Sequence, residues 1–341
     1  MCTRGEELRQ FTAVFANYIC HFGPSKVLLD LAREVVVPSF TDDSYVRSYG
    51  ATTYHFHETE LLVLDDTTVP PVLGIAGRFV KNTIIKRVQV FDDAQGIVKD
   101  PKYMESAPSV LFVLVLNTHR LIYMPETPSA PNLDAFRATS QLFLTKQYQK
   151  FVDLVYNIPS NRSKGITKKR IREVFPGPLL NVVPLTGSEG IAAFIDRYSI
   201  LKKIEFKLIK PNDDIDAGEI FQQMREFSSN LGADRTKFTV ANPEEGLDKS
   251  VATESVQQAT ERGNQEITLD GLDEAGQKLL GNNENFQIQV QIPDVPSDKK
   301  QAIMLLYKKY KQLSEGGELY EPEMTAEVEA KVHSLKGIID G

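Results

Sequence analysis

Residues 108–131 read PSVLFVLVLNTHRLIYMPETPSAP and contain the most apolar run of the chain. Residues 110–116 are all apolar, Asn117-Thr118 interrupts them, and a second, largely apolar run follows over residues 120–124. A continuous run of this kind, rich in Val and Phe and bounded by turn residues, is typical of a strand buried on both faces. The sequence therefore predicts a β-hairpin at the centre of a sheet.

Alternation of apolar and polar residues predicts further strands before this hairpin. They cover residues 45–49, 52–64, 73–79 and 83–91. Residues 92–106 are polar around Gly96 and predict a loop. After the hairpin, Asn132 is expected to cap a long helix that ends at residue 157 and covers one face of the sheet.

The N-terminal residues predict a helical hairpin beside this sheet. Apolar side chains recur at spacings of three and four over residues 6–22, as in an amphipathic helix, and Gly23-Pro24 would stop it. A second helix, capped by Ser25, is expected to continue through residue 37 and to end at Pro38.

Length and composition favour two domains, because 341 residues with 41% apolar content suffice for two cores. The predicted fold class is α+β. We expect an N-terminal domain over residues 1–158, mostly an antiparallel sheet with flanking helices, and a basic linker over residues 159–178. A smaller, α/β sandwich-like domain over residues 179–341 would include a last strand at residues 286–292 and end in helices.

Cysteine content and hydropathy indicate a cytoplasmic protein. Cys2 and Cys20 are the only cysteines, too few for a disulfide framework. No segment approaches the roughly 20 apolar residues that span a bilayer. Residues 11–22 are the one candidate for a signal core, but Glu6 and Glu7 stand where a signal peptide carries basic residues.

Histidines offer one candidate metal site. His55 and His57 alternate on a predicted strand beside Glu60, so both imidazoles would lie on one face, and His119 on the central hairpin could be a third ligand. The simpler interpretation is that the first three are solvent-facing strand residues, and we prefer it.

Two groups of carboxylates could hold a divalent cation, as in a metal-dependent nuclease. They are Asp213, Asp214 and Asp216, and Asp270, Asp273 and Glu274. Helix capping explains the first group equally well, and turn formation explains the second. Nucleotide-binding and hydrolase motifs are absent from the sequence, so we expect no catalytic residue, metal or cofactor, and no enzymatic activity.

Basic residues give the sharper signal, although the net charge of the whole chain is −7. The predicted linker holds the first cluster, the strands before the central hairpin hold the second, and a strand of the second domain holds the third. The candidate nucleic-acid contacts are Arg162, Lys164, Lys168, Lys169, Arg170 and Arg172; Arg78, Lys81, Lys86 and Arg87; and Lys203 and Lys207. Such clusters can follow phosphates with little sequence preference, or they can be solvated strand edges and linker.

Several segments in residues 45–293 follow one another in a characteristic order. They are PSVLFVLVL at 108–116, VVPLTGSEG at 182–190, KKIEFKLIKP at 202–211, Asn-Pro at 242–243 and ITLDGLDEAGQKLLG at 267–281. In this order the chain resembles the RexA-type phage-exclusion proteins, and the Asp-Glu-Ala-Gly at residues 273–276 is the closest literal match.

The resemblance implies a non-enzymatic sensor of infection that binds DNA, forms homodimers and signals to a multi-span membrane protein. We therefore expect binding to double-stranded DNA without strong sequence preference, within an abortive-infection defence against phage and at the inner face of the membrane. Two alternatives from other classes remain. One is a metal-dependent nuclease or other effector enzyme, and the other is a protein-interaction scaffold that uses exposed apolar faces.

Overall fold

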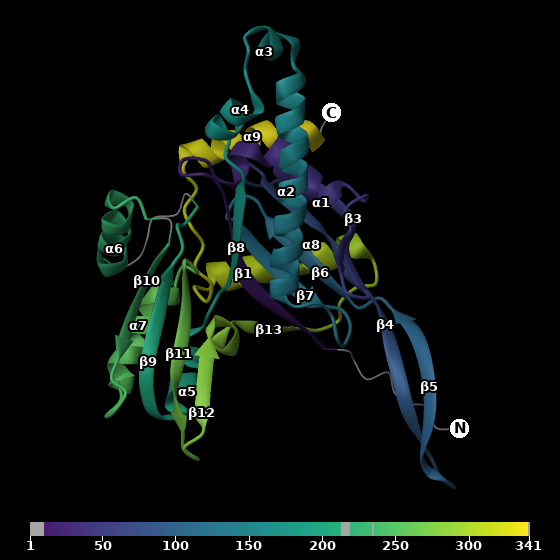
Figure 1. Cartoon of the computed structure of the whole chain (residues 1–341), viewed down its shortest axis with the longest axis vertical. Helices are drawn as coiled ribbons and strands as arrows, with labels where there is room; N and C mark the ends of the chain where they lie inside the picture. The colour runs from purple at the N-terminus through teal and green to yellow at the C-terminus, as the bar shows by residue number, and fades with distance from the viewer. Residues whose placement is uncertain (1–9, 213–218, 234, 340–341) are drawn as a thin grey trace.

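The computed structural model describes residues 10–212, 219–233 and 235–339. Within these residues the chain forms two antiparallel sheets with helices around them, which confirms the predicted α+β class (Figure 1). Side by side, the first sheet holds β13 (Gln289–Ile292), β1 (Phe11–Phe22), β7 (Arg120–Pro125), β6 (Ser109–Val115), β4 (Val72–Asp92), β3 (Thr52–Asp65) and β2 (Arg47–Tyr49). In addition, β5 (Gly96–Ser106) pairs with β4, and β8 (Pro178–Pro184) pairs with β1.

The predicted central hairpin is confirmed as β6 and β7. Val113 pairs with Ile122 in the middle of the hairpin, and both side chains are fully buried. Strand β6 also pairs with β4, and β7 pairs with β1, so neither strand lies at an edge of the sheet. Burial on both faces is the reason the two strands are continuously apolar.

The helix predicted over residues 6–22 is wrong, because residues 11–22 form strand β1. Ala13 and Phe15 point into the core on one side of the sheet, and Tyr18 and Phe22 into the core on the other. In a segment that is apolar on both faces, apolar residues recur at the spacing of a helix as well as at the spacing of a strand, so periodicity does not separate the two. Pairing with β7, β8 and β13 decides in favour of the strand.

Three other local predictions also need correction. The loop expected over residues 92–106 is largely strand β5, and the strands expected at 73–79 and 83–91 are parts of one strand, β4. Pro38 does not end a helix but lies in the first turn of α1 (Val37–Thr41), after the short turns η1 (Leu28–Leu31) and η2 (Ala32–Val36). Proline is tolerated there because a first-turn N–H has no partner within the helix.

Two long helices pack on opposite faces of the first sheet. Helix α2 (Leu133–Asn157) begins as predicted at Asn132, whose side chain accepts a hydrogen bond from the Ala135 N–H at 3.0 Å. Its Phe136 lies against Phe56, Phe79 and Phe112, with ring centroids 5.2–5.6 Å apart. Helix α8 (Lys299–Glu315) covers the other face, and α9 (Ala326–Ile339) packs on the α2 side.

The second sheet is smaller and has its own core. Its strands lie in the order β10 (Thr236–Ala241), β9 (Tyr198–Leu208), β11 (Gln265–Asp273) and β12 (Lys278–Asn282). Apolar residues of α5 (Ser188–Asp196), α6 (Glu219–Asn230) and α7 (Lys249–Thr260) pack against it, and η3 (Asn283–Phe286) closes the core. As predicted, Ile204 and Phe206 of β9 point inward.

Strands from both sides of the expected linker contribute to the first sheet. Strand β8 and the last strand, β13, both pair with β1, and α8 packs on the same sheet. The chain therefore leaves the first sheet after β8, builds the second sheet, and returns at β13. Among the described residues, no helix combines the length and apolar character needed to cross a bilayer.

The turn between β6 and β7 is a buried polar cluster. His119 has a positive φ of 55° and is 2% exposed, and Arg120 is fully buried, with its guanidinium donating to the Tyr320 carbonyl at 3.3 Å. Burial, reinforced by the charge of Arg120, lowers the pKa of His119 to about 3. This imidazole is therefore neutral in the fold at any pH above that value.

A change of His119 to Asn, which tolerates a positive φ, should reduce the acid sensitivity of the fold. Below the ordinary pKa of 6.5, the unfolded chain binds a proton at His119 that the folded chain does not bind. The wild-type free energy of unfolding should therefore fall by about 2 kcal/mol more than that of the variant between about pH 7 and about pH 5. Urea unfolding at both pH values measures this difference.

The exposed His333, changed to Asn, is the matched control and should reproduce the wild-type pH profile. Parallel pH profiles for the wild type and the His119→Asn variant would contradict the assignment.

Candidate nucleic-acid interface

The first basic cluster lies at the far end of α2. There the chain turns into α3 (Pro159–Ser163) and α4 (Lys168–Val174), which form one end of the molecule along its longest axis (Figure 1). We call residues 158–174 the basic tip. It contains Arg162, Lys164, Lys168, Lys169, Arg170 and Arg172, and all of these except the half-buried Lys168 are exposed.

Local interactions hold the basic tip against α2. The Asn161 side chain donates to the Val155 carbonyl at 2.8 Å, and the Thr167 hydroxyl caps α4 by accepting from the Arg170 N–H. On the side that faces α2, Ile171 is buried. Residues 168–174 therefore form a helix within the expected linker, and the six cations of the basic tip lie on a scaffold that packs against α2.

Few carboxylates balance these cations. Lys168 pairs with Asp153, Arg170 pairs with Glu173 at 3.0 Å, and Arg172 donates to the neutral Gln149 at 3.1 Å. Lys164 and Lys169 make no ion pair with any residue that the structure describes. Most of the positive charge of the basic tip therefore faces solvent.

The second cluster divides between a projecting ribbon and the body of the molecule. Strands β4 and β5 extend together beyond the first sheet as an arm, residues 81–106 (Figure 1). Lys86 on this arm lies over the Tyr103 ring at 5.8 Å, Arg87 pairs with Asp100, and Lys81 is half-buried at the base.

The arm also exposes apolar side chains on both of its faces. The cross-strand pair Phe91 and Ile97 is 73% and 69% exposed, and Tyr103 is 70% exposed. Others of this kind are Ile84, Ile85, Val88 and Met104. An apolar surface of this extent is uncommon on a monomer and is typical of an interface.

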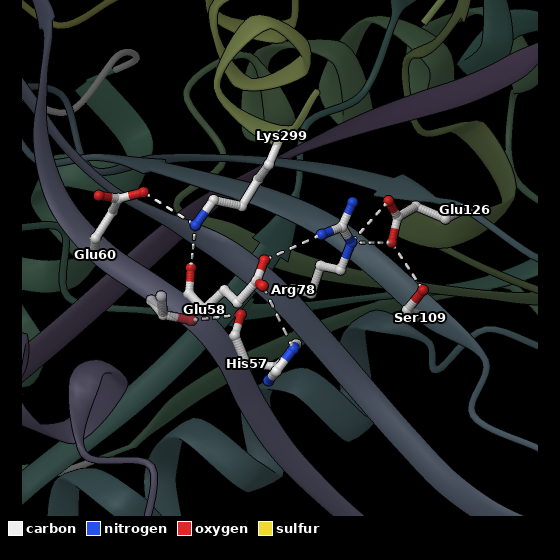
Figure 2. A network of polar contacts seen from close by, with 8 residues as sticks. His57, Glu58, Glu60, Arg78, Ser109, Glu126 and Lys299 are labelled. Atoms are coloured by element: carbon white, nitrogen blue, oxygen red, sulfur yellow. Dashed lines mark hydrogen bonds and ion pairs between the residues drawn. The ribbon is translucent and has the colours of Figure 1, made fainter. Parts of the chain in front are cut away.

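Arg78, by contrast, belongs to a network of charges at the base of the arm (Figure 2). Its Nε donates to both carboxylate oxygens of Glu126 at 3.0 and 3.1 Å, and its Nη1 lies 3.4 Å from Glu58. Glu126 also accepts from the Ser109 hydroxyl at 2.7 Å. These contacts neutralise the guanidinium and direct it toward carboxylates instead of solvent.

A bulge in β3 and the start of α8 complete this network. Glu58 has a positive φ of 49°, and Thr59 packs so closely over Gly77 of β4 that a Cβ there would overlap it. Lys299 of α8 donates to the Glu58 carbonyl at 2.7 Å and pairs with Glu60 at 3.0 Å (Figure 2). The network therefore joins β3, β4 and α8 where the arm leaves the sheet.

The third cluster lies within a ladder of alternating charges. Lys207 of β9 pairs with Glu266 at 2.6 Å, and Lys237 of the neighbouring strand pairs with Glu205 at 2.6 Å. The hydrogen bond from Lys237 lowers the pKa of Glu205. In the β9–β11 register, Lys203 lies opposite Asp270. Carboxylates therefore accompany these lysines along the sheet.

The candidate metal ligands are spread over several environments. The rings of His55 and His57 lie 6.4 Å apart, Glu60 is engaged by Lys299, and His119 is buried in the core. Asp270 pairs with Lys278, and Asp273 accepts from backbone N–H groups of its own turn. Asp213, Asp214 and Asp216 lie outside the described residues. Within those residues, no group of three or more His, Cys, Asp or Glu side chains is arranged to hold a metal ion.

Sequence reasoning missed an aromatic residue at the basic tip. Tyr156 lies in the last turn of α2. The Arg162 Cζ lies 5.6 Å, and the Lys168 Nζ 5.5 Å, from the centroid of its ring. A tyrosine shortly before a basic segment is a signal for nucleic-acid binding that could have been read from the sequence. A scan against protein-family models and a search of curated proteins found no match for this chain.

Replacing Arg78 with Gln should destabilise the fold without weakening nucleic-acid binding. The change leaves Glu126, whose side chain is 20% exposed, without its main partner. We expect the free energy of unfolding to fall by about 1–2 kcal/mol in urea denaturation. Arg87→Gln on the exposed arm is the control and should cost less than about 0.5 kcal/mol. An unchanged stability together with a weaker affinity for DNA would instead make Arg78 a contact residue.

Proposed function

We propose that this protein binds double-stranded DNA through phosphate contacts made by the basic tip. The observation that carries the proposal is the placement of six cations at one end of the molecule, where Asp153 and Glu173 are the only carboxylates paired to them among the described residues. Clusters of this kind release counterions from DNA and bind with little sequence preference. The Arg78 network and the β9 ladder are balanced by carboxylates and support this function less.

The wider role that we propose follows the resemblance to RexA-type proteins. In this role the chain is a component of an abortive-infection defence against phage and acts with a multi-span membrane protein at the inner face of the membrane. A neighbouring reading frame that encodes such a membrane protein would support this role, and unchanged phage plating after deletion of the gene would contradict it.

The arm supports a second function, the binding of another protein chain. A two-stranded ribbon is marginally stable alone in water and gains stability when further strands or apolar surfaces cover it. Its exposed apolar residues on both faces are available for such cover. Because the resemblance implies a homodimer, we propose a second copy of this chain as the partner.

Reversing the charge of Lys164, Lys169 and Arg172 to Glu should weaken DNA binding. At about 100 mM salt we expect the affinity for a random-sequence duplex to fall about 100-fold, and the slope of log affinity against log salt to fall by about 2 to 3. Fluorescence anisotropy titrations at several salt concentrations measure both quantities.

The matched control reverses Arg197, Lys300 and Lys308, three exposed cations away from the basic tip, and changes the net charge equally. It should leave the affinity within about threefold of the wild type. Equal losses in the two variants would mean that the net charge, and not the basic tip, governs binding.

Changing Phe91, Ile97 and Tyr103 of the arm to Ser should dissociate the dimer. By light scattering at about 10 μM, we expect the wild type at twice the 38.2 kDa chain mass and the variant at the chain mass. Phe227, Leu231 and Leu280 are similarly exposed, and their change to Ser is the control that should remain dimeric. A monomeric wild type would rule out the second copy as the partner.

A further inference from the structure

A solvent-open cavity of about 410 Å³ lies on the surface between the last turn of α2 and the segment that joins α3 to α4. The lining residues are Tyr156, Arg162, Gly165, Ile166, Thr167 and Lys168. An aromatic ring and an aliphatic side chain thus form part of the wall, and two cations form another part. Such a wall suits a ligand that combines a flat apolar ring with a negative charge.

Short-range hydrogen bonds fix the shape of this cavity. The Ile166 N–H donates to the Asn161 carbonyl at 3.0 Å, and the Gly165 N–H donates to the Arg162 carbonyl at 3.0 Å. Gly165 has a positive φ of 65°, which allows the chain to turn back toward Tyr156. The pairing of Lys168 with Asp153 of α2 holds the opposite side. The cavity is therefore formed before any ligand arrives.

We propose that this cavity binds one unstacked nucleotide, with its base against Tyr156 and Ile166 and its phosphate at Arg162. The proposal rests on the proposed DNA binding and adds to it a preference for strand ends and unpaired segments. Bases stack on tyrosine rings and on arginine guanidinium planes, and any base offers such a face. The volume accommodates a single nucleotide, while Lys164, Lys169 and Arg172 lie outside the cavity where the flanking phosphates would run.

A direct comparison of two DNA probes tests this proposal. One is a relaxed, covalently closed duplex circle, which has neither strand ends nor unpaired nucleotides, and the other is a linear duplex that carries a short single-stranded overhang and has the same number of phosphates. The wild type should bind the overhang probe about tenfold more tightly in anisotropy titrations. Tyr156→Leu should abolish this preference and leave the affinity for the closed duplex within about twofold. Tyr156→Phe, which keeps the ring, should retain the preference.

The control variant is Tyr49→Leu, which removes an exposed tyrosine from β2 and should keep the tenfold preference. Competition with dAMP distinguishes a nucleotide within a strand from a free one. If dAMP lowers the affinity for the overhang probe to the affinity for the closed duplex, the unpaired end of the strand occupies the same cavity as dAMP, and the strand end is supported as the ligand. Binding of dAMP that depends on Tyr156, without any preference between probes, supports the same chemistry with a free nucleotide.

Equal affinity of the wild type for both probes, with no binding of dAMP, overturns the nucleotide cavity and leaves the proposed duplex binding intact. An equal loss of affinity for both probes in Tyr156→Leu likewise overturns it, because the ring would then only support the basic tip. Failure of the wild type to bind either probe would overturn the proposed function and this inference together.

Discussion

The hydrogen bonds that β1 makes along both of its edges hold the two halves of the chain together. On one edge β1 pairs with β7 of the central hairpin, and on the other it pairs with β8 and β13. The second sheet lies between β8 and β13 in the sequence. By pairing with both strands, β1 holds together the two ends of the segment that forms the second sheet. Loss of β1 pairing would therefore leave the central hairpin with an open edge and release both connections to the second sheet.

The central hairpin and α2 could be predicted from the sequence because their signals are local. A continuous apolar run ends in turn residues, and a helix begins at a capping Asn. Strand β1 could not be predicted, since an apolar segment buried on both faces fits either period and its partners lie far along the chain. Strand β5 was missed for the opposite reason. It has no buried face, so its alternation does not separate apolar from polar residues.

The clusters of basic residues could be recognised in the sequence. Which of these residues pair with a carboxylate in the fold could not. Arg78 and Lys207 look alike as strand cations, but the fold brings Glu126 to the first and Glu266 to the second. Glu126 directly follows β7 and Glu266 lies on β11, and the pairing of the strands brings both carboxylates to their cations. The basic tip differs because it projects from the end of α2, where few neighbouring elements can supply carboxylates. Projection from the body thus keeps a cation available for a partner.

The basic tip and the arm are both continuations of elements whose inner parts belong to the core. Helix α2 buries Phe136 and Phe143 in its first half and carries Tyr156 in its last turn. Strand β4 buries Ile75 and Phe79 and then runs outward into the arm (Figure 1). A side chain on such a continuation needs no loop to position it, since the core fixes its direction. The core of the first sheet therefore fixes the direction of both proposed interaction surfaces, and core mutations should affect the two together.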